Sequence, residues 1–191
     1  MKLSECRKLI RSPLTGYWYR AVRHEHWKTR PSARHTATVT TRFNSGSIDA
    51  PSYQVLYLAQ DHQLALFEVS ALVGKPRAPI PNPQSTWTTL NLRVILQAVS
   101  DLTNPLEQKR IGTSAQELTG KWDQYEELGQ APTHVLGAAL FELPVLEGFL
   151  VPTAVPGVSG INLVVFPEKL ASGSRIELRN PDTGRIERLK A

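Results

Sequence analysis

Cysteine and long apolar runs are what this sequence has least of. The chain of 191 residues contains one cysteine, Cys6. This excludes an intramolecular disulfide, a four-cysteine zinc site and an iron–sulfur cluster, and it is typical of a reducing compartment. Because Cys6 lies so near the first residue, we expect an unstructured thiol. No apolar run approaches the roughly 18 residues of a membrane span, and residues 1–8 lack the apolar core of a signal peptide. We therefore expect a soluble protein of the cytoplasm.

Several motifs that carry chemistry are also missing. No glycine-rich phosphate loop of the Walker or dinucleotide kind occurs, which argues against an NTPase and a Rossmann dehydrogenase. No Gly-x-Ser-x-Gly elbow is present. His24 and His26 flank Glu25, but no third ligand follows at a recognisable spacing, so we expect no metal ion. No zinc finger, RNP-type motif or basic helix predicts direct contact with nucleic acid.

Charge is present in modest excess. The 22 Lys and Arg residues outnumber 17 Asp and Glu residues, which gives a net charge of +5. The segment from Arg20 to Arg42 is richer, with six Arg and Lys residues against Glu25 alone. Two interpretations stay open: a solvated basic face, or a site for an anionic ligand or partner.

Short strand-like and helix-like segments alternate along the chain without a strict βαβ rhythm. The apolar patterns predict strands over 16–22, 54–59, 90–96, 99–103, 148–152 and 162–166, and helices over 62–73, 113–118, 121–128 and 133–143. Two loops are expected, over the polar residues 24–41 and as a stiff surface loop over the proline-rich residues 75–83.

These elements favour an α+β fold: a single compact domain with a split or curved, mainly antiparallel sheet flanked by helices. We assign this domain to residues 16–170. An N-terminal extension covers residues 1–15, and residues 171–191 hold a hairpin, predicted over 174–189, that packs on the same domain.

Glu68 breaks the pattern of the helix predicted over 62–73, which Asp61 would cap and Gly74 would close. At 100° per residue, Glu68 falls in the middle of an apolar arc, where burial of a charge is costly. The arc consists of Leu64, Ala65, Phe67, Ala71 and Leu72. Three explanations stay open: an ion pair with Arg20 or Arg42, a helix rotated so that Glu68 reaches a rim, or a functional carboxylate.

A set of polar residues in apolar contexts resembles the RES domain family, the toxins of RES–Xre toxin–antitoxin systems. The resemblance rests on the order and spacing of Tyr19-Arg20, Arg42-Phe43-Asn44, 56–59, 65–69, 101–103, Trp122, 148–152 and 162–167. Arg42 and Glu68 match the Arg and Glu that give the family its name. Thr153 stands where the family usually has Ser, and Thr40-Thr41 replace a usual Gly-Gly.

The resemblance implies a fold like that of ADP-ribosyltransferases and NAD as a substrate, with no cofactor. Glu68, Tyr57 and Arg42 would be catalytic. Arg20 and Arg42 would bind the pyrophosphate, while Tyr57 would stack on nicotinamide and orient it through its hydroxyl. Asn44 and Thr153 would contact the ribose or support such contacts. From the residues alone, Tyr57 is equally a core aromatic, and Arg20 a structural partner of Glu68.

The resemblance also implies a partner, an Xre-like antitoxin that forms an inhibitory complex, binds the DNA itself and covers or enters the NAD pocket. The expected reaction is cleavage of the nicotinamide–ribose bond, with water or phosphate as acceptor. Two alternatives stay open: mono-ADP-ribosylation of a protein target, and a degenerate domain that only binds, in line with the departures at Thr40-Thr41 and Thr153.

Overall fold

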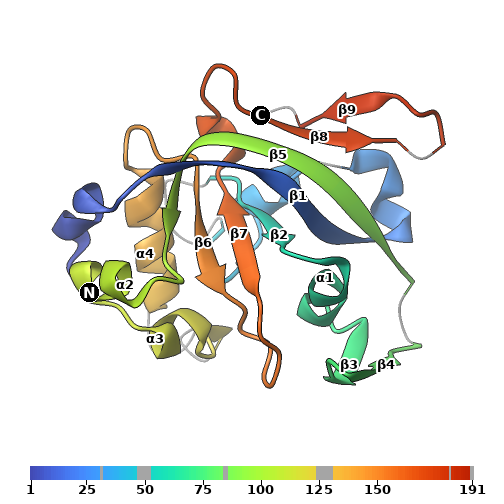
Figure 1. Ribbon diagram of the computed structural model, residues 1–191, viewed down its shortest axis with the longest axis horizontal. Helices are drawn as coiled ribbons and strands as arrows, with labels where there is room; N and C mark the ends of the chain where they lie inside the picture. The colour runs from blue at the N-terminus through green and yellow to red at the C-terminus, as the bar shows by residue number, and fades with distance from the viewer. Residues whose placement is uncertain (31, 47–52, 84–85, 124–130, 181, 190–191) are drawn as a thin grey trace.

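A strongly curved sheet of seven strands forms the frame of the protein (Figure 1). The structure is a computed structural model that describes the chain except residues 31, 47–52, 84–85, 124–130, 181 and 190–191. The strands are β1 (Ser12–Arg23), β2 (Leu56–Ala59), β5 (Trp87–Asp101), β6 (Gly148–Pro152), β7 (Ile161–Val165), β8 (Arg175–Arg179) and β9 (Ile186–Arg188). Their order is β1-β2-β7-β6-β5-β8-β9.

The sheet closes on itself because its two longest strands also pair with each other. β1 and β5 are antiparallel partners from Arg23↔Trp87 to Ser12↔Val99. β1 also meets β2 at Tyr19↔Ala59, and the last residues of β5 pair with β6. Among the named strands of this sheet, β5 and β6 are the parallel pair and the others are antiparallel. The prediction of a curved, mainly antiparallel sheet in an α+β domain is confirmed.

Helices flank this sheet in two places (Figure 1). The α-helices are α1 (His62–Glu68), α2 (Pro105–Ile111), α3 (Ala115–Thr119) and α4 (Pro132–Phe141). Short 3-10 helices cover Leu3–Lys8 (η1), His24–Thr29 (η2), Arg34–Ala37 (η3) and Pro167–Lys169 (η5). In Figure 1, α2, α3 and α4 gather at one end of the sheet, and α1 lies apart from them near β2. No helix among the described residues is long and apolar enough to cross a membrane.

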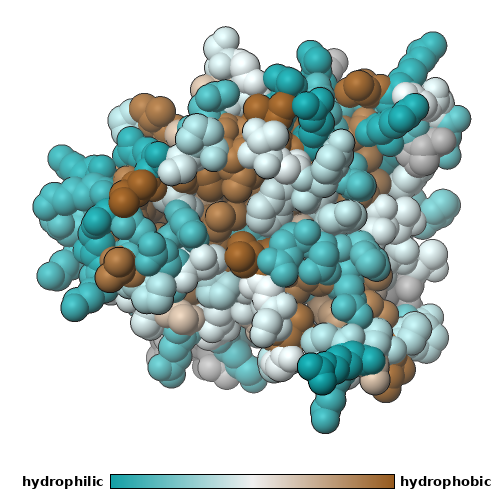
Figure 2. Space-filling model, viewed as in Figure 1, coloured by the Kyte–Doolittle hydropathy of each residue, from teal (hydrophilic) through white to brown (hydrophobic). Residues whose placement is uncertain are grey.

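Apolar side chains pack on both faces of the central strands. In β6, Phe149 belongs to the core cluster that includes α4, whereas Leu150 packs against the cluster formed by β2, β5 and β8. In β7, Val164 and Val165 divide in the same way. Alternate residues of a strand point to opposite faces, so these uninterrupted apolar runs reflect strands covered on both sides. Polar side chains cover the end of the molecule formed by η1 and α2 (Figure 2).

The predicted helix over 62–73 is too long. α1 begins after Asp61, whose carboxylate accepts a hydrogen bond from the Leu64 amide at 2.8 Å, but it ends at Glu68. Ser70 has a φ of 56°, and the Ala71 amide donates to the Leu66 carbonyl at 2.9 Å. Helices commonly end at a residue in the left-handed conformation that is followed by such a hydrogen bond. Here Ser70 takes this role, so the helix ends before the predicted Gly74.

The proline-rich segment 75–83 is not the loop that we expected. Its residues belong to a hairpin of β3 (Leu72–Lys75) and β4 (Ala78–Pro81). In a two-stranded sheet each strand is an edge strand, and one of its sides pairs with no other strand. Pro79 and Pro81, which lack a backbone N–H donor, can be accommodated on that side. The predicted strands 90–96 and 99–103 are one strand, β5, and the predicted loop 24–41 contains η2 and η3.

The remaining predictions concern the C-terminal hairpin, two helices and residues 1–15. The hairpin over 174–189 is present as β8 and β9, and β8 joins the main sheet through β5. The helix over 133–143 is present as α4, and the predicted helix 121–128 lies largely outside the described residues. In the predicted N-terminal extension, residues 1–15, β1 begins at Ser12 and Cys6 is fully buried in the core. The expectation of an unstructured thiol is therefore wrong, and burial raises the pKa of Cys6.

Candidate active site

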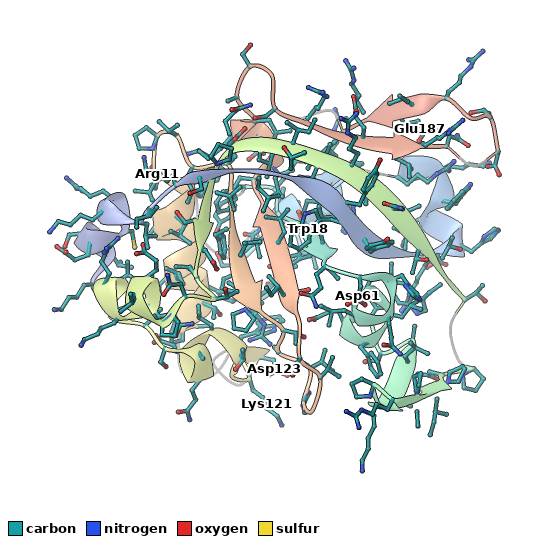
Figure 3. All side chains as sticks on the ribbon, viewed as in Figure 1. Arg11, Trp18, Asp61, Lys121, Asp123 and Glu187 are labelled. Carbon is teal, nitrogen blue, oxygen red and sulfur yellow. The ribbon has the colours of Figure 1, made fainter. Side chains whose placement is uncertain are left out.

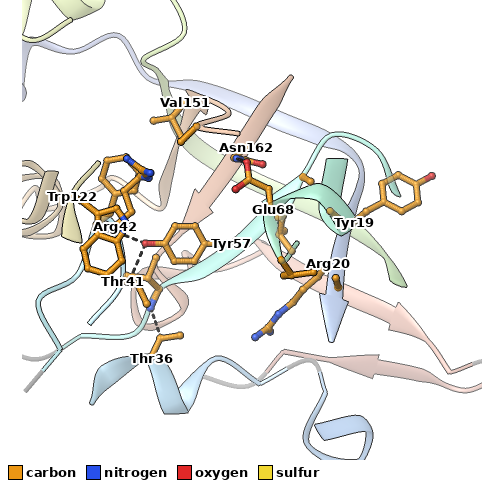
Figure 4. Close-up of a pocket in the computed structure, with 18 of the residues that line it drawn as sticks. Tyr19, Arg20, Thr36, Thr41, Arg42, Tyr57, Glu68, Trp122, Val151 and Asn162 are labelled. Carbon is orange, nitrogen blue, oxygen red and sulfur yellow. Dashed lines mark hydrogen bonds between the residues drawn. The ribbon is translucent and has the colours of Figure 1, made fainter. Parts of the chain in front are cut away.

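A cavity of about 460 Å³ opens beside β1, β2 and α1 and brings four predicted site residues together (Figure 4). Arg20 comes from β1, Arg42 from the segment before β2, Tyr57 from β2 and Glu68 from α1. Its volume lies within the range of small-molecule sites.

Glu68 is exposed toward this cavity and is not buried in the core. Glu68 escapes the burial that the apolar arc implied because α1 stops at Glu68, so Ala71 and Leu72 do not extend the arc around it. Leu64 and Phe67 are buried, which orients α1 with Glu68 at the rim. Of the three explanations left open for Glu68, the structure shows the one in which the helix places it at the rim of the cavity.

Two neighbouring side chains fix the Glu68 carboxylate. The Thr153 hydroxyl and the Asn162 amide each donate a hydrogen bond of 2.5 Å to its Oε1 atom. Within the described part of the chain, Oε2 has no hydrogen-bond partner. Hydrogen bonds to a charged acceptor are strong and directional. The arrangement therefore holds the carboxylate in one orientation and leaves one oxygen available to a ligand.

Thr153 supports the carboxylate from behind. Its side chain is buried and is not among the described residues that line the cavity. Besides donating to Glu68, the Thr153 hydroxyl accepts a hydrogen bond from the Val155 amide at 3.2 Å. The hydroxyl that the family provides through serine is thus retained, and its contact is with Glu68.

Tyr57 lies in the wall of the cavity with its hydroxyl already engaged. The oxygen accepts a hydrogen bond from the Phe43 amide at 3.0 Å and lies 3.0 Å from the Thr41 hydroxyl. Burial raises the pKa of Tyr57 to about 12, so the phenol stays protonated at neutral pH. A tyrosine hydroxyl has one proton to donate. The aromatic ring, more than the hydroxyl, is therefore the part of Tyr57 available to a ligand.

Arg42 reaches across the cavity toward α3. Its Nη1 donates to the Leu118 carbonyl at 3.3 Å and to the Gly120 carbonyl at 2.5 Å. Burial lowers the pKa of Arg42, while the charge of Glu68 raises it in part. Among the described residues, the Nε and Nη2 donors have no partner. They can therefore meet an anion while Nη1 anchors the group.

Arg20 turns its guanidinium away from Glu68 (Figure 4). Its Nη1 donates to the Ser32 carbonyl at 3.0 Å, and burial lowers its pKa to about 10. The structure therefore does not show the ion pair between Arg20 and Glu68 that the sequence left open. A half-buried, desolvated cation of this kind favours a nearby anion, since an anion restores the electrostatic stabilisation that water provides elsewhere.

Asn44, like Thr153, is a predicted site residue that does not line the cavity. It is fully buried, and its amide donates to the carbonyls of Thr36 and Tyr53 at 2.7 and 2.6 Å. Its side-chain oxygen accepts from the Gly46 amide at 2.9 Å. With these bonds made, Asn44 holds the segment next to Arg42 and has no group left for a ribose.

Three residues to which the sequence analysis assigned no role also shape the cavity, and two of them, Trp122 and Asn162, belong to the segments that carry the resemblance. Asn162 orients Glu68, and Trp122 lines the cavity and packs its ring 5.5 Å from that of His134. His134 is buried and donates from Nε2 to the Thr41 carbonyl at 2.8 Å. The available signal was a polar Asn at the start of an apolar strand. No three His, Cys, Asp or Glu side chains among the described residues gather as metal ligands would.

The fold and site define an α+β domain in which a curved sheet and one short helix hold a carboxylate, a tyrosine and two arginines around one cavity. The family model of the RES domain matches residues 17–187, and the chain belongs to the RES domain family. No curated protein matches the sequence.

The fold is also similar to a solved structure. A chain of the crystal structure of the M. tuberculosis MbcT–MbcA toxin–antitoxin complex superimposes with a TM-score of 0.66 at 19% sequence identity. The similarity covers 98% of this chain and 91% of that chain. It therefore extends over the whole fold.

Proposed function

We propose that this protein is the toxin of a toxin–antitoxin pair and that it cleaves the nicotinamide–ribose bond of NAD. The observation that carries the proposal is the Glu68 carboxylate, held through Oε1 by Thr153 and Asn162, with Oε2 unpartnered by any described residue at the cavity. Membership of the RES domain family and the similarity of the fold to a chain of a toxin–antitoxin complex support it.

The proposed chemistry needs a fixed negative charge beside the ribose. When the bond between nicotinamide and ribose breaks, its electron pair goes to the nicotinamide nitrogen, which leaves neutral. The ribose carbon then carries oxocarbenium-like positive charge. A preorganised carboxylate stabilises this charge more strongly in the transition state than in the substrate. Glu68 would supply it, and Oε2 would also orient the acceptor or a ribose hydroxyl.

Arginines near the carboxylate would hold the rest of the substrate. Arg42 offers Nε and Nη2 donors that no described residue engages, and Arg20 is a desolvated cation at the other side of the cavity. Guanidinium groups bind phosphate oxygens bidentately, which a lysine does less well. The ring of Tyr57 would stack on nicotinamide.

The departures from the family pattern keep their hydrogen-bonding groups in use. Thr153 retains the hydroxyl that contacts Glu68, and the Thr41 hydroxyl contacts Tyr57. Thr40 donates to the Ser45 carbonyl at 3.2 Å. These contacts support an active site over a degenerate domain that only binds.

The similar structure is that of a toxin–antitoxin complex, which motivates a partner for this chain as well. We propose an Xre-like antitoxin that covers the cavity and inhibits cleavage in the cytoplasm. Such a partner would bind DNA itself, so the positive charge of this chain needs no nucleic acid to explain it.

The test is incubation of the purified protein with NAD in water and in phosphate buffer, with products resolved by mass spectrometry. If water is the acceptor, we expect free nicotinamide together with ADP-ribose. If phosphate is the acceptor, we expect free nicotinamide together with phosphorylated ADP-ribose in phosphate buffer. NAD labelled in the ADP-ribose moiety should leave proteins unlabelled. Binding of NAD without nicotinamide release would overturn the proposed cleavage. Label transferred to a protein would overturn water or phosphate as the acceptor and would favour ADP-ribosylation.

A further inference from the structure

A second cavity, which we call the basic groove, lies next to the active-site cavity. Its volume is about 890 Å³, and none of the described residues that line it is acidic. Five arginines and two histidines contribute to its walls: Arg20, Arg23, Arg30, Arg34, Arg188, His26 and His35. A concave surface that carries one sign of charge concentrates ligands of the opposite sign. The groove therefore fits an anionic ligand.

The basic groove adjoins the active-site cavity through shared residues. Arg20, Ala21 and His35 line both cavities. A ligand that contacts Arg20 from the active-site side can therefore extend into the groove. In the proposed substrate, the group that follows the pyrophosphate is the adenosine, so adenosine is the part that would cross this junction.

Acidic residues outside the groove neutralise only part of its charge. Arg23 lies 3.6 Å from Glu25, and Arg188 lies 3.0 Å from Glu177. Arg30 lies 3.7 Å from Asp182 and 3.9 Å from Glu187. Arg34, in contrast, is exposed, and its guanidinium has no hydrogen bond or ion pair with any described residue. It is the groove cation most available to a new anion.

The positive surroundings of the junction disfavour protonation of His35. The pKa of His35 is lowered by burial first, and then by the positive charges of Arg20 and His26. Arg20 is itself desolvated. An anion bound beside Arg20, His35 and Arg34 would favour protonation of His35, and it would gain charge-assisted hydrogen bonds from the arginines.

An aromatic surface stands beside these cations. The half-buried Trp87 ring lines the groove, and the Arg23 guanidinium lies 5.3 Å from its centroid. Indole rings and guanidinium planes both stack on nucleobases. The groove thus combines a flat surface for a base with cations for a phosphate.

We propose that the basic groove binds a phosphate carried on the adenosine ribose, so that the protein prefers NADP to NAD. This inference rests on the proposed function, because it places the dinucleotide in the active-site cavity. A phosphomonoester carries close to two negative charges at neutral pH. NAD has no group at this position that could neutralise Arg34, whereas NADP carries its 2′-phosphate there.

The test uses nucleotides that cannot react, so that binding is measured apart from turnover. By calorimetry, adenosine 2′,5′-bisphosphate should bind at least about tenfold more tightly than adenosine 5′-monophosphate, as one charge-assisted contact implies. It should also bind more tightly than adenosine 3′,5′-bisphosphate, which has the same charge. Arg34→Ala should abolish this preference, and Arg7→Ala, an exposed arginine in η1, should retain it.

The outcomes separate this inference from the proposed function. Equal binding of the nucleotides, or an unchanged preference in an Arg34→Ala variant of unchanged melting temperature, would overturn the inference even if NAD is cleaved. A 2′-phosphate preference without nicotinamide release from NAD or NADP would support the groove and overturn the proposed cleavage. Arg34→Ala should lower cleavage of NADP more than cleavage of NAD, whereas Arg7→Ala should change neither.

Discussion

Glu68 is oriented by neutral hydrogen-bond donors, with no described cation in direct contact. Thr153 and Asn162 both donate to Oε1. An ion pair at this point would lower the charge available to a substrate and would occupy the carboxylate. Neutral donors fix the group without cancelling it, which is what a carboxylate that stabilises a developing cation requires.

The hydroxyl of Tyr57 contributes to stability more than to ligand contact. Tyr57→Phe leaves the Phe43 amide and the Thr41 hydroxyl without their partner. Loss of a buried partner costs about 1–3 kcal/mol, so thermal and urea unfolding should show a loss of that size. Tyr17→Phe, at an exposed position of β1, is the matched control and should leave stability unchanged.

The same variant separates the two roles of Tyr57. Because the ring remains, Tyr57→Phe should retain most NAD cleavage under conditions in which the protein is folded. A variant that keeps full stability but loses cleavage would contradict this division, since the hydroxyl would then act on the substrate.

At the scale of elements, α4 determines where Arg42 lies. Gly137 faces the segment after Arg42 so closely that a Cβ atom there would lie 2.0 Å from the Phe43 carbonyl oxygen. His134, one turn earlier, donates to the Thr41 carbonyl. Together these contacts hold residues 41–43 against α4.

Gly137→Ala tests this packing. Alanine favours a helix over glycine by about 1 kcal/mol, but an overpacked backbone contact costs about 1–3 kcal/mol and shifts the segment. We expect lower stability and weaker NAD binding, measured by urea unfolding and calorimetry. Gly16→Ala is a control, because its Cβ would meet its nearest described atom at 3.6 Å. A stabilised Gly137→Ala variant with unchanged binding would contradict the proposed packing.

Local sequence signals predicted an element well where neighbouring residues alone determine it. The Asp61 cap, the apolar strands β6 and β7 and the turn of the C-terminal hairpin all come from short-range chemistry. Figure 3 shows Asp61 at the start of α1, as the cap predicts. The sequence also carried a signal that we did not use, since Asn104 caps α2 and Gly112 ends it with a φ of 66°.

Other features depend on the folded molecule. Ser70 adopts a left-handed conformation that serines rarely take, so the end of α1 was not visible in the sequence. The contacts that position the carboxylate join residues 85 and 94 positions apart. No local pattern predicts such contacts; the resemblance to the family identified Glu68 and Thr153 but not that they touch.

At the scale of the whole molecule, one sheet positions both cavities. β1 contributes Arg20 to each of them, and β2 contributes Tyr57 to the first. The segment from Arg20 to Arg42, in which positive charge is concentrated, supplies most of the cations of the basic groove. Part of the modest net charge of +5 is thus gathered at one place beside the candidate active site.

The most direct test of the account compares nicotinamide release from NAD by the wild-type protein, Glu68→Gln and Glu142→Gln, an exposed glutamate at the end of α4. Glutamine keeps the shape of Glu68 but removes its charge. We predict at least about 100-fold slower release for Glu68→Gln, the scale of losing one preorganised electrostatic group. Its melting temperature should match the wild type, and Glu142→Gln should retain full release. Undiminished release by a folded Glu68→Gln variant would contradict the account.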